Sequence, residues 1–226
     1  MTRKYPGMRR LILILPLVAM LSACIDSPRG GPGKSLRPTA STITPRPEAR
    51  QCLANLGQTN ASFTPLPDQY FGGGCSNLNT VRLSALRGDF EQLGVSNLGP
   101  VACPLASAFA QWARFGVDRA ARQILGSGLV RIETMGSYSC RNVAGSGRRS
   151  AHAMANAIDV AAFVLENGQR ISVLDDWDGG TRTEREFLRV VQDSACKRFG
   201  TVLGPAYNQA HRNHFHLEVS SSSFCR

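Results

Sequence analysis

The chain has 226 residues, and its 26 lysines and arginines against 16 aspartates and glutamates give it a formal net charge of +10. Residues 1–23 hold four of the basic residues and no acidic residue, so the remainder carries +6. The basic residues are dispersed and are not gathered with aromatic residues, which argues against a nucleic-acid-binding protein. A modest basic excess instead suits weak attraction to an anionic polymer or to lipid headgroups.

Residues 1–23 have the three parts of a secretory signal peptide. A basic start precedes an apolar run over residues 11–21, which is too short to span a bilayer comfortably. The run ends in Leu-Ser-Ala before Cys24, which resembles a bacterial lipobox, where the cysteine is lipidated and becomes the mature amino terminus. We expect an exported lipoprotein, anchored in a membrane at the periplasmic face of the cell envelope. An ordinary signal peptide with an incidental cysteine is the alternative, and the choice between inner and outer membrane stays open.

The segment after Cys24, residues 24–50, is rich in proline, glycine, serine and threonine and has no apolar period. It cannot bury enough apolar surface to offset the entropy of ordering, so the sequence predicts a disordered tether. Such a chain would reach on the order of 25 to 30 Å if flexible. Residues 51–226 have a length that suits one domain with a single core.

Six cysteines lie within the expected domain, and none belongs to a Cys-x-x-Cys pair, which argues against a thiolate metal site. In an exported protein we expect them to form three disulfides; buried free thiols are the alternative. The sequence alone does not choose among the pairings that six cysteines allow. The residues are Cys52, Cys75, Cys103, Cys140, Cys196 and Cys225.

The first third of the domain is glycine-rich and reads as irregular, with a turn at residues 71–75 and a strand at residues 80–83. Pro104 suits the first turn of a helix. Apolar residues then recur at helical spacing, and we expect them in the core. They are Leu105, Ala108, Phe109, Trp112 and Phe115.

The second half reads as strands around one helix. Alternating polarity predicts a strand at residues 129–135, and an Asn-Gly turn predicts a hairpin between residues 157–163 and 169–174. A capping box at Thr183-Glu-Arg-Glu186 predicts a helix to about Phe199. Its inward residues are expected to be Phe187, Leu188, Val191 and Cys196, and short strands at residues 201–203 and 214–219 would follow. The predicted fold class is α+β, a small mixed or antiparallel sheet with flanking helices, stapled by disulfides.

All four histidines lie in two short clusters, and this distribution suggests a metal site. His152 precedes the strand that carries Asp159, while alternation along the last strand would place His214 and His216 on one face. Imidazole and carboxylate groups are usual ligands of catalytic zinc, which takes three protein groups and leaves one position for water. We therefore predict that His152, Asp159 and His216 bind Zn²⁺. A hydrogen-bonded His and Asp pair without metal is the alternative.

The segment from Ser150 to Asp159 reads S-x-H-x-x-A-x-A-x-D. It resembles the Ser-x-His-x-x-Gly-x-Ala-x-Asp signature of zinc D-Ala-D-Ala carboxypeptidases, dipeptidases and penicillin-insensitive murein endopeptidases. In that group the His and Asp bind zinc, and the third ligand is the last His of a later motif, which His214-Phe-His216 resembles. Residues 52–225 are also similar to the bacterial extensin-like C-terminal family. These resemblances imply a zinc-peptidase-like core and a site for peptidoglycan.

Two positions depart from the peptidase pattern. Ala155 replaces the glycine, and Asn213 occupies the place where the dipeptidase branch carries a catalytic Glu. The murein endopeptidase branch has a His-x-x-His-x-His arrangement, which residues 211–216 reproduce. The resemblance therefore implies that His211 or His214 is the general base.

Further site residues are expected around this centre. Arg141 stands where relatives carry a substrate-facing arginine, so it would stabilise the oxyanion or bind a substrate carboxylate. Arg148 and Arg149 are alternatives, and a solvated loop charge is the other interpretation of each. Ser150, Tyr138 and Glu218 are expected to bind substrate or to support the ligands.

Three functions remain open at this point. The first is a zinc-dependent hydrolase of peptidoglycan peptide bonds, an endopeptidase or a carboxypeptidase on stem or cross-link peptides. The second is a catalytically silent cell-wall-binding lipoprotein with a structural metal, and the third is a zinc amidohydrolase of another small envelope amide. The sequence does not identify the bond, an activating partner or the oligomeric state.

Overall fold

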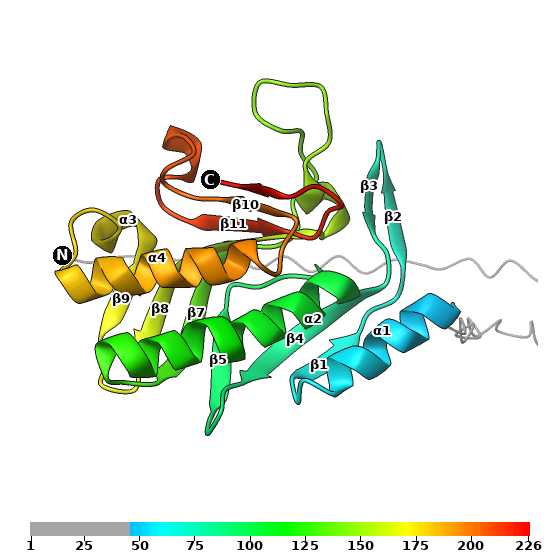
Figure 1. The fold of residues 1–226 in the computed structure, drawn as a ribbon. Helices are drawn as coiled ribbons and strands as arrows, with labels where there is room; N and C mark the ends of the chain where they lie inside the picture. Colours follow the sequence, from blue (N-terminus) through cyan, green and yellow to red (C-terminus); the bar gives the residue numbers. More distant parts are fainter. Residues whose placement is uncertain (1–45) are drawn as a thin grey trace, which may run out of the picture. The chain divides into compact units, whose positions relative to one another are not determined.

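The computed structural model describes residues 46–226, which fold around a ten-stranded mixed sheet (Figure 1). The expected signal peptide, Cys24 and most of the expected tether at residues 24–50 lie outside the described residues. The first helix begins at Pro47, ahead of the expected domain boundary at Gln51. Within residues 46–226, no helix is both long and apolar enough to cross a membrane.

Four α-helices are connected by strands and shorter helical turns. Proline at the first turn begins both α1 and α2, where its missing N–H has no helical partner to lose. After α2, π-helical turns at Ala113–Asp118 and Ala121–Leu125 lead to Gly126, which ends the segment in a left-handed conformation. The helices are α1 (Pro47–Gly57), α2 (Cys103–Trp112), α3 (Val173–Asp176) and α4 (Arg182–Cys196).

The main sheet has the strand order β1-β4-β5-β7-β8-β11-β10-β12, with β6 added to β4 and β9 added to β8. Two neighbouring pairs, β5 with β7 and β10 with β12, are parallel. A separate two-stranded sheet consists of β2 and β3. The strands are β1 (Ser62–Pro65), β2 (Gln69–Gly72), β3 (Cys75–Asn77), β4 (Thr80–Arg87), β5 (Gln92–Ser96), β6 (Val101–Ala102), β7 (Leu129–Gly136), β8 (Ala157–Leu165), β9 (Arg170–Ser172), β10 (Thr201–Leu203), β11 (Phe215–Glu218) and β12 (Phe224–Cys225).

The hydrophobic core lies between one face of this sheet and the helices α2 and α4, which run side by side in Figure 1. Trp112 of α2 packs edge-on against Phe163 of β8, with ring centroids 6.0 Å apart, and its indole N–H donates to the backbone of Val191 in α4. Phe163 also meets Phe187 of α4 at 5.4 Å. Aromatic packing therefore fastens both helices to the central strand β8.

Three disulfides are present within residues 46–226, as the count of cysteines in the domain predicts. Cys52–Cys103 joins α1 to α2, and Cys75–Cys140 joins β3 to the segment after β7. Cys196–Cys225 joins the end of α4 to β12. Each bridge closes a loop between elements far apart in sequence, which restricts the unfolded chain and so stabilises the fold.

The α+β class is confirmed, but the sheet is larger than expected and the first third of the domain is not irregular. That region contains α1 and the strands β1 to β6, whose short strands carry too few apolar residues to give a clear period. The expected hairpin partner at residues 169–174 ends at Ser172, because the Ser172 hydroxyl caps α3 by accepting from the N–H of Asp175.

Two details of the helices also differ. The capping box lies at Thr181 and Glu184, two residues before the predicted one, since Thr181 is the last extended residue before α4 and its hydroxyl accepts from the N–H of Glu184. Phe115 is 41 % exposed and not in the core. It lies in the first π-helical turn, where wider winding changes which residues share a face, and Arg119 lies over its ring at 4.7 Å.

Candidate metal centre

Antiparallel pairing of β8 with β11 brings two of the predicted ligands together. In the register of these strands Asp159 lies opposite His216, and the flanking pairs are Val160 with Phe215 and Ile158 with Leu217. The flanking residues are buried in the core beneath the helices. Because side chains alternate along a strand, Asp159 and His216 point to the opposite face of the sheet.

The third predicted ligand, His152, comes from the short 3₁₀-helix Ala151–Met154 that precedes β8. Ser150 begins this turn, and its hydroxyl oxygen accepts from the N–H of His152 at 3.3 Å. The turn ends at Ala155, whose φ of 53° is left-handed, a conformation that glycine adopts without strain. The zinc-peptidase signature has glycine at this position, which suits a left-handed conformation. In this chain Ala155 adopts that conformation.

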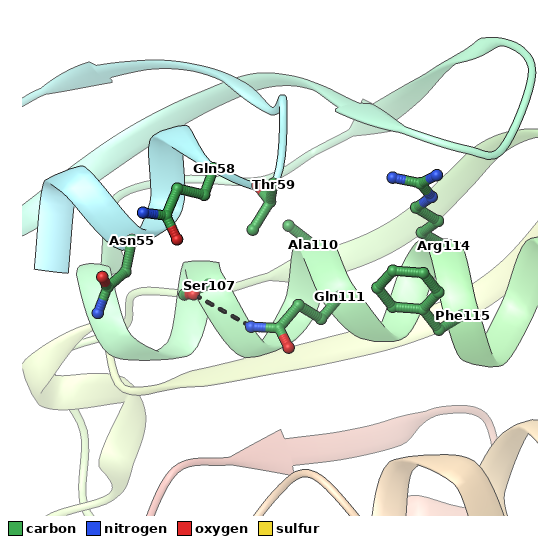
Figure 2. Close-up of a pocket in the computed structure, with 8 residues that line it drawn as sticks. All are labelled: Asn55, Gln58, Thr59, Ser107, Ala110, Gln111, Arg114 and Phe115. Carbon is green, nitrogen blue, oxygen red and sulfur yellow. Dashed lines mark hydrogen bonds between the residues drawn. The ribbon is translucent and has the colours of Figure 1, made fainter.

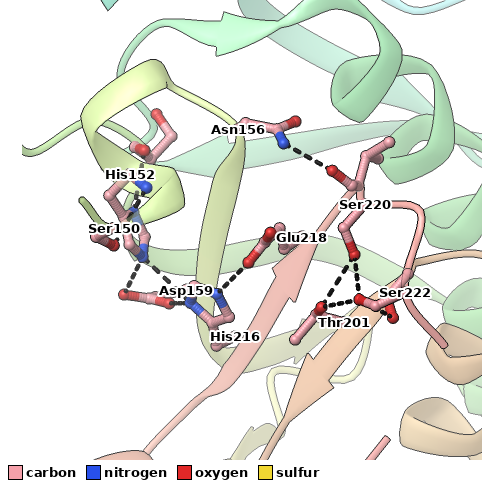
Figure 3. Close-up of polar contacts among 12 residues, drawn as sticks. Ser150, His152, Asn156, Asp159, Thr201, His216, Glu218, Ser220 and Ser222 are labelled. Atoms are coloured by element: carbon pink, nitrogen blue, oxygen red, sulfur yellow. Dashed lines mark hydrogen bonds and ion pairs between the residues drawn. The ribbon is translucent and has the colours of Figure 1, made fainter. Parts of the chain in front are cut away.

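The three candidate ligands converge on one point (Figure 3). His152 Nε2 lies 3.2 Å from His216 Nδ1 and 3.2 Å from Asp159 Oδ2, while His216 Nδ1 lies 2.9 Å from Asp159 Oδ1. Zinc bonds of about 2.0 to 2.1 Å in tetrahedral geometry place neighbouring ligand atoms about 3.3 to 3.4 Å apart. The donor set and its spacing therefore fit a zinc ion held by two imidazoles and one carboxylate.

Each imidazole has a second polar partner, a hydrogen bond for His152 and an ion pair for His216. His152 Nδ1 lies 3.0 Å from the carbonyl oxygen of Ser137, so an N–H at Nδ1 leaves Nε2 free to bind metal. His216 Nε2 lies 3.6 Å from Glu218 Oε2, in the direction opposite to its ligating Nδ1. A carboxylate behind a ligating histidine is the usual support of zinc sites. Glu218 lies on this side of His216, and its supporting role stays a prediction.

The charges of His152, Asp159 and His216, which we refer to as the trio, are strongly coupled. Burial favours the neutral carboxyl of Asp159, but hydrogen bonds from His152 and His216 outweigh it and lower the pKa of Asp159. Burial likewise disfavours protonated His216, yet the bond to Asp159, followed by Glu218, raises its pKa to about 9. Without metal, His216 is therefore protonated at neutral pH, and a metal ion must displace this proton to bind.

The remaining two histidines lie beside the trio. His214 is buried, its Nδ1 lies 2.8 Å from Asn213 Oδ1, and its Nε2 lies 3.5 Å from Asp159 Oδ1. Burial lowers the pKa of His214. His211 Nδ1 lies 2.7 Å from Asn208 Oδ1, and burial, followed by repulsion from His214 and His216, lowers the pKa of His211 to about 4.

Both of these rings are accordingly neutral at pH 7, and each directs its Nδ1 N–H toward an asparagine oxygen. This tautomer leaves Nε2 unprotonated and able to accept a proton. Asn213 orients His214 and does not replace the missing glutamate as a base. Asn208 was not predicted as a site residue, although it lies three residues before His211, a spacing at which local side-chain hydrogen bonds form.

His211, His214 and His216 line a pocket of about 600 Å³. Its walls include the predicted residues Arg141 and Ser150, together with Glu218 and three histidines. The guanidinium groups of Arg141 and Arg148 have no hydrogen-bond or ion-pair partner within residues 46–226, so they are available to an anionic ligand. Residues that the sequence analysis did not place in the site also line it: Thr201, Leu203, Asn208, Ser222 and Phe224.

Two other predicted residues lie elsewhere or are already engaged. Arg149 Nε donates to the carbonyl oxygen of Gly73, and its Nη1 donates to Asn142 Oδ1 at 2.8 Å, so it fastens two loops together. Tyr138 packs against Phe71 with ring centroids 5.4 Å apart and does not line the pocket. Of the three candidate arginines, Arg141 and Arg148 are therefore the ones available to a ligand.

A second pocket, of about 380 Å³, lies between α1 and the helical segment that follows β6 (Figure 2). Amide and hydroxyl side chains such as Asn55, Gln58 and Gln111 line it, together with Arg114 and Phe115. It contains neither a histidine nor a carboxylate, so it offers no general base and no set of metal ligands.

The sequence profile of the extensin-like protein C-terminus family matches residues 50–226. The chain belongs to this family. The extensin-like domain thus begins within α1 and includes every strand, all three disulfides and the histidine site. No curated protein and no solved structure gives a significant match to the chain.

Proposed function

We propose that this extensin-like protein is a zinc-dependent hydrolase that cleaves peptide bonds of peptidoglycan in the cell envelope. The observation that carries the proposal is the convergence of His152, Asp159 and His216 at tetrahedral spacing, at the edge of an open pocket. The resemblance of the Ser150 to Asp159 segment to zinc peptidases of the wall supplies the substrate class. Export, a lipid anchor at Cys24 and a zinc-peptidase-like core belong to the same proposal.

In this proposal three protein ligands leave a fourth position open toward the pocket, as catalytic zinc sites do and closed structural sites do not. When bound, zinc supplies Lewis acidity at this position. The Glu218 carboxylate pairs with the Nε2 side of His216, and the Ser137 carbonyl bonds to His152 Nδ1, so both imidazoles are oriented before substrate arrives.

The pocket residues provide the remaining chemistry. His211 is neutral and presents an unprotonated Nε2, so it is the group we propose to accept a proton and return it to the leaving amine. His214 has the same tautomer but is more deeply buried, and it is the second choice. Arg141, without a partner in the described protein, would stabilise negative charge on the substrate carbonyl or bind a substrate carboxylate.

A second candidate is a catalytically silent wall-binding lipoprotein that retains a structural metal. Asn213 favours it, because this side chain takes the place of the dipeptidase glutamate and its oxygen is already bonded to His214. A third candidate, hydrolysis of another small amide, uses the same ligand chemistry.

Incubation of purified sacculi with metal-free and zinc-loaded protein, followed by mass spectrometry of released fragments, separates these candidates. Zinc-dependent cleavage of stem or cross-link peptides supports the hydrolase. Binding to sacculi without products supports the silent protein, and failure to act on or bind sacculi leaves the third candidate. If the protein takes up no zinc at all, the proposal of a zinc-dependent hydrolase is wrong.

A further inference from the structure

The hairpin of β2 and β3 exposes two adjacent aromatic side chains. Tyr70 is 72 % exposed and Phe71 is 50 % exposed, and Phe71 packs against Tyr138 at 5.4 Å. Phe71 and Tyr138 thus form a ring pair, and the exposed ring of Tyr70 is next to it along β2; grouped exposed aromatic residues mark a binding surface more often than scattered ones do. We refer to Tyr70, Phe71 and Tyr138 as the aromatic hairpin surface.

A disulfide and a hydrogen bond attach this hairpin to the rest of the domain. Its two strands form a sheet of their own, and an isolated two-stranded hairpin is marginal in water. Cys75 bonds to Cys140, and Arg149 donates to the carbonyl oxygen of Gly73. The aromatic rings are therefore displayed on a hairpin whose turn is attached to the domain at two neighbouring points, Gly73 and Cys75.

The same fastenings connect the hairpin to the candidate metal centre. Arg149 lines the pocket and also bonds the hairpin turn. β3 packs against the 3₁₀-helix that carries His152, and Cys140 directly precedes Arg141. Arg149 therefore bridges the wall of the pocket and the turn of the hairpin.

The hairpin strands carry no charged residue, which favours an uncharged ligand. No acidic or basic residue lies between Gln69 and Asn77, and the one arginine at the turn already donates to Gly73 and Asn142. Surfaces that bind anionic membranes combine aromatic residues with available lysine and arginine, which this hairpin lacks. A saccharide suits it better, because aromatic rings pack on the apolar C–H face of a sugar while the sugar hydroxyls stay in water.

We propose that the aromatic hairpin surface binds the glycan strand of peptidoglycan while the attached peptide enters the pocket. This inference rests on the proposed function for the identity of the polymer. It adds a binding site separate from the metal centre, and it makes polymeric wall, not free peptide, the preferred substrate.

Co-sedimentation of the full chain with glycan strands freed of their peptides tests the inference without any cleavage. The test variant is Tyr70→Ala/Phe71→Ala, and the matched control is Phe90→Ala, which removes a ring that is 68 % exposed at the turn between β4 and β5. We expect wild type and F90A to bind alike and the double variant to bind about tenfold more weakly, the change expected for losing part of a buried aromatic contact. Far-ultraviolet circular dichroism and thermal melting check that all three proteins fold.

Equal binding by the double variant and wild type would overturn the inference, as would wild type that binds anionic vesicles but not the stripped strands. The outcome is separable from that of the hydrolase proposal. Glycan binding without zinc-dependent cleavage of sacculi keeps the hairpin site and rejects the enzyme, whereas cleavage of sacculi by a protein that does not bind stripped glycan does the reverse. If both hold, Y70A/F71A loses activity on sacculi but keeps activity on free peptides.

Discussion

Replacement of His216 by alanine is the most direct test of the metal centre. His216 supplies one of three ligand atoms and makes two of the three short contacts within the trio, at 2.9 Å to Asp159 and 3.2 Å to His152. Its removal leaves one imidazole and one carboxylate facing an open pocket. The variant also removes a hydrogen bond that lowers the pKa of Asp159, so that pKa rises toward its ordinary value.

The expected loss of affinity can be worked from the ligand count. Four-ligand zinc sites bind with about 10 to 16 kcal/mol, so each ligand contributes about 2.5 to 4 kcal/mol if the contributions are shared equally. One factor of ten corresponds to about 1.4 kcal/mol, so His216→Ala should weaken zinc binding by about 60-fold to 700-fold. Hydrolysis of sacculi should disappear with the metal.

Competition with a chromophoric chelator measures this affinity, and elemental analysis gives the stoichiometry. His211→Ala is the matched control, because it removes a pocket imidazole whose Nδ1 bonds to Asn208 and not to the trio. We expect the control to retain one zinc per chain. Undiminished zinc affinity in folded H216A, or an equal loss in H211A, would refute the assignment of the ligands.

Other predictions follow from the same geometry. His211→Ala should lower kcat by about 10²-fold or more if His211 is the general base, while zinc content is unchanged; a rate equal to wild type assigns the base elsewhere. Apparent zinc affinity should rise by up to about tenfold per pH unit until pH reaches the His216 pKa of about 9, as measured by chelator competition, because bound metal displaces the His216 proton. Asp89→Asn should destabilise the domain by about 1 kcal/mol at pH 7 in denaturant titrations, since Arg119 and Arg114 hold the partly exposed carboxylate. Those bonds lower the Asp89 pKa from 3.8 to about 2, so this stabilisation is present above pH 3.8 and is lost as pH falls toward 2, and a pH-independent difference between D89N and wild type would contradict it.

Strands and helices with a strong local pattern were predictable from the sequence. The alternation over residues 129–135 corresponds to β7, and the proline at the start of α2 lies where the sequence indicates. The short strands β1, β5 and β6 were not predictable, because their residues pair with partners far away in sequence and show little alternation of their own. Phe115 was misplaced for a related reason, since nothing local signals the change to π-helical winding after Trp112.

The residues of the candidate site also differ in how far they were predictable from the sequence. Chemistry and spacing along the chain were sufficient to select His152, Asp159 and His216, which the structure brings together. The difference between Arg148 and Arg149 was not predictable, because it depends on contact with Gly73 in a distant hairpin. Asn213 was singled out only as the replacement of a glutamate, and Asn208 was not predicted, because the tautomers that these asparagines fix in His214 and His211 depend on hydrogen bonds seen only in the folded chain.

Because Asp159 and His216 lie opposite each other across β8 and β11, two of the three candidate ligands come together only when these two distant strands have paired. A shift of one residue in that pairing would send one ligand of the pair into the core side of the sheet. Under the proposed function, metal loading would therefore report correct strand assembly, and a chain that is still unfolded would have no complete site with which to capture zinc. In an exported protein, the metal would be acquired only in the compartment where the domain folds.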